Sequence, residues 1–347
     1  MSAQDTAPSS VSGSPSEAVE APTVGSLDPP LLSIIIPTHN RAAFVQRAIR
    51  CALAQTGISV EVIVIVDGSS DNTLEVLAAY RDEQLKVIVH REARGVAAAR
   101  NAGVAVASGT YLAFLDDDDV WAEDKCASQM EAIAASCCDW SFTAAVVVDE
   151  NLRPRGHEPV LLDGDLSDEL LRHNIVPGGA SSVVAKTSLV RELGGFDPSF
   201  SSMADWDLWI RLSQRSQVAA VDRPLVGYFL HAGSMAHNIQ MTERDFLALA
   251  EKYESLRSER GLNLDTKGNV HYLFGCALRE GDRRAAWRLG MRLVELEGWT
   301  KRGLAALAAV SVFGPRLQAL HYYHARRNMP ESDAEEWLAP LRRSLKL

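Results

Sequence analysis

Four consecutive carboxylates, Asp116 to Asp119, directly follow an apolar segment. We expect residues 111–115 to form a strand on which side chains alternate between faces, so that Asp116 and Asp118 project to the same side, roughly 7 Å apart. This spacing suits one shared divalent cation, and such hard oxygen ligands favour Mg²⁺ or Mn²⁺ with positions left open for phosphate oxygens. The alternative is an acidic turn that caps a helix beginning near Trp121, because Asp is favoured at helix N-termini.

Two further predicted strands also end in polar residues. Residues 33–36 are an apolar run that stops at the polar stretch 37–41, and residues 60–66 are a second run that stops at the polar turn 67–73. A helical pattern follows each turn. Three strand ends therefore present polar groups at one edge, and ligands of open α/β sheets bind at that edge, outside the carboxyl ends of the strands.

These segments resemble the family 2 glycosyltransferases, which are inverting enzymes of GT-A fold that use nucleotide sugars. The resemblance rests on four motifs in the family's order and spacing: Pro37 to Arg41, Val66 to Ser69, Ala99 to Gly103 and Phe114 to Asp119. It covers residues 31 to about 240. It implies an α/β fold with a Rossmann-like, mainly parallel central sheet flanked by helices, a divalent metal (Mg²⁺ or Mn²⁺), and a nucleoside-diphosphate sugar donor, with a UDP-sugar as the first candidate.

The resemblance assigns roles residue by residue. Binding of the nucleotide sugar falls to Pro37, Thr38, Asn40, Arg41, Asp67, Ser69, Arg100, Asp116 and Asp117. Metal ligation falls to Asp116, Asp118 and His231, the last in a motif similar to the family's closing motif. One departure affects the nucleotide site, because Val66 stands where the family often has a first Asp and leaves Asp67 alone to meet the base.

Asp205 is the candidate general base. It precedes Trp206 in residues 203–212, a segment that is similar to the acceptor side of the family. An inverting transfer needs one carboxylate to take the proton of the acceptor hydroxyl, while a metal and positive groups stabilise the departing diphosphate. Ala204 stands where many members have Glu. The alternative is that Asp205 only caps the following helix, and Asp207 is then the nearest replacement base.

Composition and charge limit the other possibilities. With 347 residues, of which 47% are hydrophobic and 23% charged, the chain can bury a large α/β core and carry an appended module. Five Cys without metal-binding spacing favour a reducing, cytoplasmic compartment. The formal net charge is −10. Without a strongly basic patch we expect no nucleic-acid partner, and a phosphate site in acidic surroundings needs a cation.

The chain divides into three predicted parts. Residues 1–30 are rich in Ser, Pro and Ala, contain no Lys or Arg and lack the apolar stretch of a signal peptide, so we expect a disordered tail. Residues 31–240 form the GT-A domain, with a nucleotide-sugar half at 31–150 and an acceptor half at 151–240. Residues 241–347 form a C-terminal all-helical extension.

Apolar stripes at helical spacing support the helical extension. The stripes are Phe246, Leu249, Ala250 and Tyr253; Tyr272, Leu273, Cys276 and Ala277; and Ala286, Leu289 and Leu293. The stretch from Lys301 to Arg327 is apolar with flanking bases but too short to span a bilayer. These helices lie on the inner face of an anionic membrane as a peripheral contact, pack on each other or on the catalytic domain, or bind a partner.

The sequence therefore predicts a metal-dependent, inverting glycosyltransferase in cell-surface polysaccharide or glycoconjugate synthesis. It would move one sugar to a hydroxyl of a glycan, lipid-linked or protein-linked acceptor. One alternative is a non-catalytic nucleotide-sugar-binding scaffold, against which intact Asp118 and Asp205 argue. The other is a nucleotidyltransferase, which would attack the α-phosphorus, but the Gly-rich basic loop typical of that class does not follow the first strand.

Overall fold

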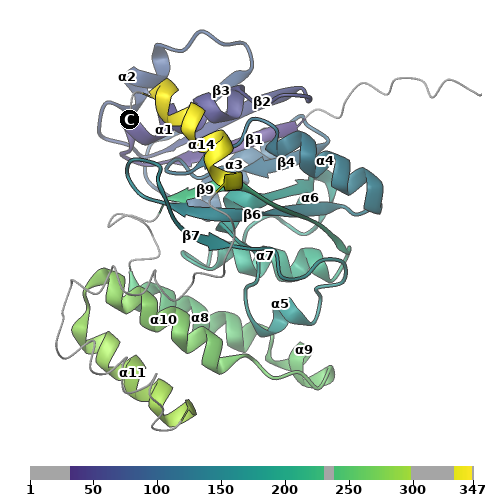
Figure 1. The fold of residues 1–347 in the computed structure, drawn as a ribbon, viewed down its shortest axis with the longest axis vertical. Coiled ribbons are helices and arrows are strands. Elements are labelled where there is room, and N and C mark those ends of the chain that lie inside the picture. The colour runs from purple at the N-terminus through teal and green to yellow at the C-terminus, as the bar shows by residue number, and fades with distance from the viewer. Residues whose placement is uncertain (1–31, 230–237, 298–331, 346–347) are drawn as a thin grey trace, which may run out of the picture.

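The computed structural model describes residues 32–229, 238–297 and 332–345 (Figure 1). The first part of the chain alternates strands and helices: β1 (Leu32–Thr38), α1 (Ala42–Leu53), β2 (Val60–Asp67), α2 (Thr73–Ala78), β3 (Leu85–His90), α3 (Val96–Val106) and β4 (Tyr111–Phe114). These four strands lie in the order β3-β2-β1-β4, and each pair of neighbours is parallel. Parallel neighbours need crossover connections, and α1, α2 and α3 supply them.

The second part completes a mixed sheet. Its elements are β5 (Val120–Trp121), α4 (Lys125–Ser136), β6 (Trp140–Val148), β7 (Pro154–Glu158), α5 (Glu169–Arg172), the 3₁₀ turn η1 (Gly179–Ser182), β8 (Val183–Lys186), α6 (Thr187–Glu192), α7 (Ala204–Ser213) and β9 (Val218–Phe229). The sheet continues from β4 as β8-β6-β9-β5, and β8 is antiparallel to both its neighbours. The expected α/β fold is confirmed. Parallel pairing occurs within β1–β4 and again between β6 and β9, whereas β8, β7 and β5 are antiparallel to their partners.

Side chains of the central strands alternate between two cores. On one face, Ile35, Ile63 and Ile65 pack in the cluster that also contains the apolar residues of α3 and α7. On the other, Ile34 and Val64 pack in the cluster that contains the buried residues of α1 and α4. All five side chains are fully buried. A strand covered on both faces reads as a continuous apolar run, which is why these runs were visible in the sequence.

Helices follow β9 in the part of the extension that the structure describes. They are α8 (Ile239–Lys252), α9 (Glu254–Glu259), α10 (Thr266–Glu280), α11 (Arg283–Glu297) and α14 (Ser332–Leu345). Figure 1 shows α8, α10 and α11 below the sheet and α14 across the front of its upper part. Ala334 and Leu338 of α14 belong to the core cluster of α1, not to that of α8. Among the described helices, none combines the length and the apolar character needed to cross a bilayer. The stretch from Lys301 to Arg327 lies outside the described residues.

The described helices of the extension pack on the domain that contains the sheet. Leu249, Leu273 and Leu289, one from each predicted stripe, are buried in the same core cluster as α7. Phe246 of α8 stacks on Trp206 of α7, with ring centroids 6.4 Å apart. α14 is joined to the other side of the domain by a hydrogen bond from its Trp337 indole to the carbonyl of Pro224. Of the predicted arrangements, the described helices therefore show packing on the domain that contains the sheet.

Asp207 ties α8 to α7. Its carboxylate is fully buried and accepts hydrogen bonds from Arg211 at 2.6 Å, Lys252 at 2.6 Å and the Tyr253 hydroxyl at 2.8 Å. All three donors belong to α7 or to the end of α8. Asp207 thus serves the packing of the helices, and this structural role argues against it as the replacement base that the sequence left open.

Replacing Asp207 tests this anchoring. Asp207→Ala should lower the free energy of unfolding by about 3 kcal/mol, because it leaves Arg211 and Tyr253 without their buried partner. Asp197→Ala is the matched control, since Asp197 is about a third exposed and contacts the same Lys252; its cost should stay below about 1 kcal/mol. Urea denaturation measures both. Equal costs for the two variants would contradict a structural role that is particular to Asp207.

Candidate active site

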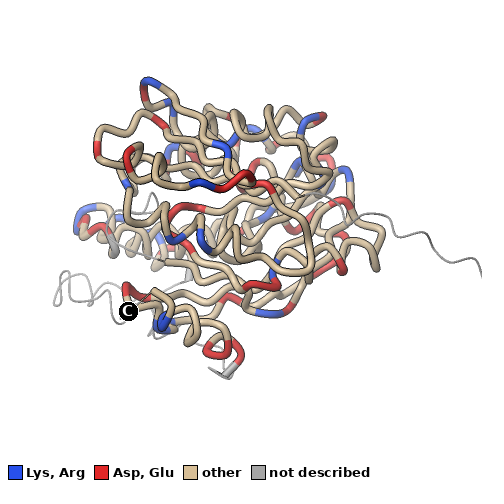
Figure 2. Tube along the Cα trace, turned by 90° about the horizontal axis from the view of Figure 1, so that it is seen from above, with Lys and Arg blue, Asp and Glu red and all other residues tan. Residues whose placement is uncertain are grey.

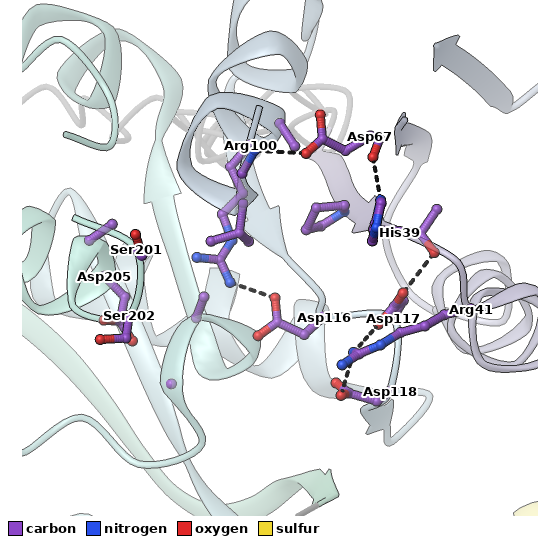
Figure 3. A pocket seen from close by; sticks show the side chains of 18 of the residues that line it. His39, Arg41, Asp67, Arg100, Asp116, Asp117, Asp118, Ser201, Ser202 and Asp205 are labelled. Carbon is purple, nitrogen blue, oxygen red and sulfur yellow. Dashed lines mark hydrogen bonds and ion pairs between the residues drawn. The ribbon is translucent and has the colours of Figure 1, made fainter. Parts of the chain in front are cut away.

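A cavity of about 380 Å³ opens at the carboxyl ends of β1, β2 and β4 and faces the start of α7; we call it the first cavity (Figure 3). The predicted site residues that line it are Pro37, Thr38, Arg41, Asp67, Arg100, Asp116, Asp117, Asp118 and Asp205. Figure 3 shows Asp205 on the opposite side of the opening from Arg41 and Asp118. The predicted edge of the sheet therefore gathers most of the expected side chains around one space.

The acidic run forms a turn. The strand ends at Phe114, and the amide of Asp119 donates to the carbonyl of Asp116 at 3.1 Å. The expectation that Asp116 and Asp118 share one face of an extended strand is therefore wrong. The alternative of a helix beginning near Trp121 is also wrong, because Trp121 pairs with β9 as part of β5 and the next helix begins later, at Lys125.

Two carboxylates of the turn meet arginines at the cavity. Arg100 donates to Asp116 at 2.5 Å, and Arg41 donates to Asp118 at 2.7 Å (Figure 3). The Arg100 guanidinium also lies over the Phe196 ring, 5.1 Å from its centroid, which fixes the orientation of this cation. The first cavity thus carries positive and negative groups side by side.

The other two carboxylates are more deeply buried. Asp117 accepts from the Thr38 hydroxyl at 2.7 Å and from Arg41 at 2.9 Å, and burial together with the Asp118 charge raises its pKa. Asp119 is fully buried and accepts from the Ser181 hydroxyl at 2.5 Å. Burial and, to a smaller extent, the Asp118 charge raise the pKa of Asp119 well above the usual range. Asp119 also accepts from the backbone of β9, so it holds the turn against the end of that strand.

Asp67 is held by the loop before α3. Its carboxylate accepts from the backbone amides of Arg94 and Gly95 at 2.9 and 2.8 Å, and contacts the His90 ring at 2.7 Å. His39 contacts the Asp67 carbonyl at 2.6 Å and lines the first cavity. A lone His has no spacing pattern in a sequence, so His39 was not predicted as a site residue.

Asn40 and Ser69 lie outside the lining of the first cavity. The backbone amide of Asn40 donates to the Ser69 hydroxyl at 2.9 Å. The side-chain oxygen of Asn40 accepts from the backbone amide of Ser70 at 2.6 Å. Asn40 adopts a left-handed backbone conformation with φ 54°, which Asn tolerates better than most residues. These two predicted nucleotide-binding residues connect the turns after β1 and β2, and other residues of these turns line the cavity.

Asp205 lies in the first turn of α7, and one of its oxygens accepts from the Trp206 amide at 2.7 Å. A Cβ atom placed on Gly179 would lie 3.6 Å from its other oxygen, so this carboxylate faces the backbone of η1 across a narrow space. Burial raises the pKa of Asp205, and the nearby Arg100 charge opposes this shift. A carboxylate with a raised pKa that lines a cavity is suited to accept a proton.

Four hydroxyl-bearing lining residues that were not predicted as site residues come from residues 151–229 and from α10. They are Ser201, Ser202, Tyr228 and Tyr272. The amides of Ser201 and Ser202 donate to the buried carboxylate of Asp245 on α8, at 2.6 and 2.7 Å. Tyr272 was expected in an apolar stripe of α10, but it is 47% exposed and borders the cavity. The helical extension thus helps to build the site.

Asp116 and Asp118 are the described residues that fit a divalent cation. Mg²⁺ and Mn²⁺ are commonly bound through one or two carboxylates, with phosphate oxygens of a substrate completing the shell. The third predicted ligand, His231, lies outside the described residues. Within those residues no group of three or more His, Cys, Asp and Glu side chains is arranged to hold a metal. Asp116 and Asp118 are therefore candidate ligands within the described residues, and each is bonded there to an arginine.

Comparison with known proteins identifies one family. The family model described as Glycosyl transferase family 2 matches residues 33–183. The putative teichuronic acid biosynthesis glycosyltransferase TuaG of Bacillus subtilis is 29% identical over 215 residues, which cover 60% of this chain and 82% of that protein. The Escherichia coli UDP-Glc:alpha-D-GlcNAc-diphosphoundecaprenol beta-1,3-glucosyltransferase WfgD is 27% identical over 197 residues, or 56% of this chain and 75% of that protein. An uncharacterized glycosyltransferase of Rickettsia conorii is matched over 32% of its length.

Solved structures share the fold. S. aureus TarS 1-349 in complex with UDP superposes with a TM-score of 0.51 at 15% identity, covering 86% of this chain and 93% of that one. The mannosyltransferase PcManGT from Pyrobaculum calidifontis, in complex with GDP-Man and Mn²⁺, gives a TM-score of 0.51 at 17% identity and covers 86% of each chain. The expected GT-A fold with a helical C-terminal region is confirmed.

The raised pKa of Asp205 makes a prediction about stability. A carboxyl group whose pKa is raised by folding favours the folded state when protonated, and this contribution is lost as the pH rises through the folded-state pKa. Asp205→Asn should therefore raise Tm at pH 8, by on the order of 2 °C. The gain should shrink as the pH falls towards the unfolded-state pKa of an Asp carboxyl, about 3.9, because Asp205 is then increasingly protonated in both states. Thermal melts across this pH range measure it, and a variant that is less stable at pH 8 would contradict the assignment.

Proposed function

Because this chain belongs to glycosyltransferase family 2, we propose that it moves one sugar from a nucleoside-diphosphate sugar to an acceptor hydroxyl, with inversion at the anomeric carbon and with a divalent cation. The proposed donor is a UDP-sugar, and the acceptor is a glycan or a lipid-linked or protein-linked saccharide. One observation carries the proposal: the Asp205 carboxylate faces the acidic turn and its two arginines across the first cavity.

The first cavity suits the donor. A diphosphate carries concentrated negative charge, and the guanidinium groups of Arg41 and Arg100 are the positive groups described at its edge. Asp67 and Thr38, at the ends of β2 and β1, are the proposed contacts of the nucleoside, because ligands of such sheets lie beyond the strand ends. A cation held by Asp116 and Asp118 would offset charge on the departing diphosphate.

Asp205 is the proposed general base. The acceptor oxygen forms a bond to the anomeric carbon from the face opposite the diphosphate, the bond from that carbon to the diphosphate breaks, and the hydroxyl proton passes to a carboxylate oxygen of Asp205. The raised pKa of Asp205 favours this step, since a base whose pKa lies closer to the working pH holds the proton better. The nucleoside diphosphate leaves on the side of Arg100 and Arg41.

The names of the relatives support a role in surface polysaccharide synthesis. TuaG is named for teichuronic acid biosynthesis, and WfgD for transfer from UDP-Glc to a diphosphoundecaprenol-linked sugar. We propose a comparable role for this chain in cell-surface polysaccharide or glycoconjugate synthesis. It would act in the cytoplasm, at the inner face of the membrane if its acceptor is lipid-linked, with the stretch from Lys301 to Arg327 as the candidate membrane contact.

Asp205→Asn tests the reaction. The variant keeps the shape of the side chain but cannot take the proton, so transfer should fall by about 10² to 10⁴-fold, while the affinity for UDP in the presence of Mn²⁺ changes little. Calorimetry measures binding. A screen of nucleotide sugars for metal-dependent release of nucleoside diphosphate first identifies the donor, and the anomeric configuration of the product is read by NMR.

Two results would contradict the proposal. Near-normal turnover of the Asn variant with an identified acceptor would exclude Asp205 as the base. A product that keeps the anomeric configuration of the donor would exclude inversion, whatever the behaviour of the variant.

A further inference from the structure

A second cavity, of about 530 Å³, adjoins the first and runs from the end of β7 to the start of α10. The two cavities share Gly179, Ser202, Asp205, Tyr228 and Tyr272 in their linings. If the donor occupies the first cavity, as proposed above, a hydroxyl that loses its proton to Asp205 must approach from the second. The chemistry of the second cavity therefore selects the acceptor.

The second cavity contains acids and amides, but no Lys or Arg side chain lines it in the described part of the chain. Glu158 accepts from the Gly178 amide at 2.8 Å, which fixes one of its oxygens at the cavity wall. Asp265 accepts from the Gly268 amide at 2.9 Å, as the N-cap of α10. With Asp205, three carboxylates border this space. A phosphate or uronate group would meet like charges there without a cationic partner.

His157, which lines this cavity, does not supply the missing positive charge. Both ring nitrogens of His157 and the Nδ1 of His173 are buried and have no hydrogen-bond partner among the described residues. Burial lowers the pKa of His157, which keeps its ring uncharged at neutral pH. The first cavity differs on this point, because Arg41 and Arg100 border it. The two cavities, which meet at Asp205, thus differ in that arginines line the first but not the second.

We propose that the second cavity binds an uncharged saccharide unit, which is the acceptor end of the reaction, and excludes sugars that carry a carboxylate or a phosphate. Carboxylate and amide groups such as Glu158 and Asn174 are partners for sugar hydroxyls. Tyr272 offers an exposed ring at the boundary of the two cavities, and Leu161 and Ile175 add apolar surface for the faces of the sugar. This inference rests on the proposed function.

Matched acceptors test the inference. p-Nitrophenyl β-glucoside and p-nitrophenyl β-glucuronide differ only at C6, where a hydroxymethyl group is replaced by a carboxylate, and the galactoside and galacturonide form a second pair. The full-length enzyme is assayed with the nucleotide sugar that it cleaves best in the presence of Mn²⁺. The neutral member of an accepted pair should have a kcat/KM at least about tenfold higher, the factor expected from roughly 1.4 kcal/mol of charge repulsion.

A charge insertion tests the cause. Leu161 is 56% exposed and lines the second cavity, whereas the adjacent Leu162 is 45% exposed and does not. Leu161→Lys should raise the ratio of kcat/KM for the glucuronide to that for the glucoside about fivefold at low salt, and this gain should shrink at high salt. Leu162→Lys is the matched control, which adds the same charge outside the lining and should leave the ratio within twofold.

Three outcomes would overturn the inference. One is a glucuronide used as well as or better than its glucoside. Another is an equal shift of the ratio by Leu161→Lys and Leu162→Lys. The third is release of nucleoside diphosphate that no glycoside of either charge accelerates, which would show that the second cavity takes no saccharide. Failure of the proposed function itself is recognised separately, because no nucleotide sugar would then be bound or cleaved.

Discussion

Four adjacent carboxylates lie in one partly buried turn, where an ion pair, hydrogen bonds or a raised pKa must offset the cost of burying each of them, and the arrangement of the site follows from this constraint. Asp116 takes Arg100 from α3, Asp117 and Asp118 share Arg41 from the start of α1, and Asp119 takes a hydroxyl from η1 and an amide from the end of β9. Each partner comes from a different element. The turn therefore brings α1 and α3 together with η1 and β9, and Asp205 faces it across the first cavity.

Features that depend on local pattern could be predicted from the sequence. The continuous apolar runs gave the buried strands β1 and β2, and the polar turns after them marked the edge where the cavity lies. The positions of charged residues in the sequence do not predict which of them pair in the folded protein. Figure 2 shows Lys and Arg interspersed with Asp and Glu along the described trace. The importance of Arg41 and Arg100 therefore came from their motifs, and their partners could be assigned only in three dimensions.

Features that depend on contacts between distant segments could not be predicted. The alternation rule failed for Asp116 and Asp118, because the hydrogen bond that closes the turn ends the extended backbone. Tyr272 is spaced along α10 as if it shared a face with the buried core residues, but in the structure its side chain lines the first cavity. Asp207 and Asp205 are equivalent acids two residues apart in the sequence, and only the packing of α8 separates a buried structural group from a candidate base.

A crystal structure with UDP and Mn²⁺ tests the central claim, that the first cavity holds a nucleoside diphosphate and its cation opposite Asp205. The anomalous signal of Mn²⁺ locates the metal independently of the interpretation of the ligand. The account predicts a peak bound to Asp118 or Asp116 and to phosphate oxygens, with Arg41 moved off at least one carboxylate. A UDP bound in the first cavity while Mn²⁺ binds elsewhere, or a diphosphate far from Arg100 and Asp205, would contradict it.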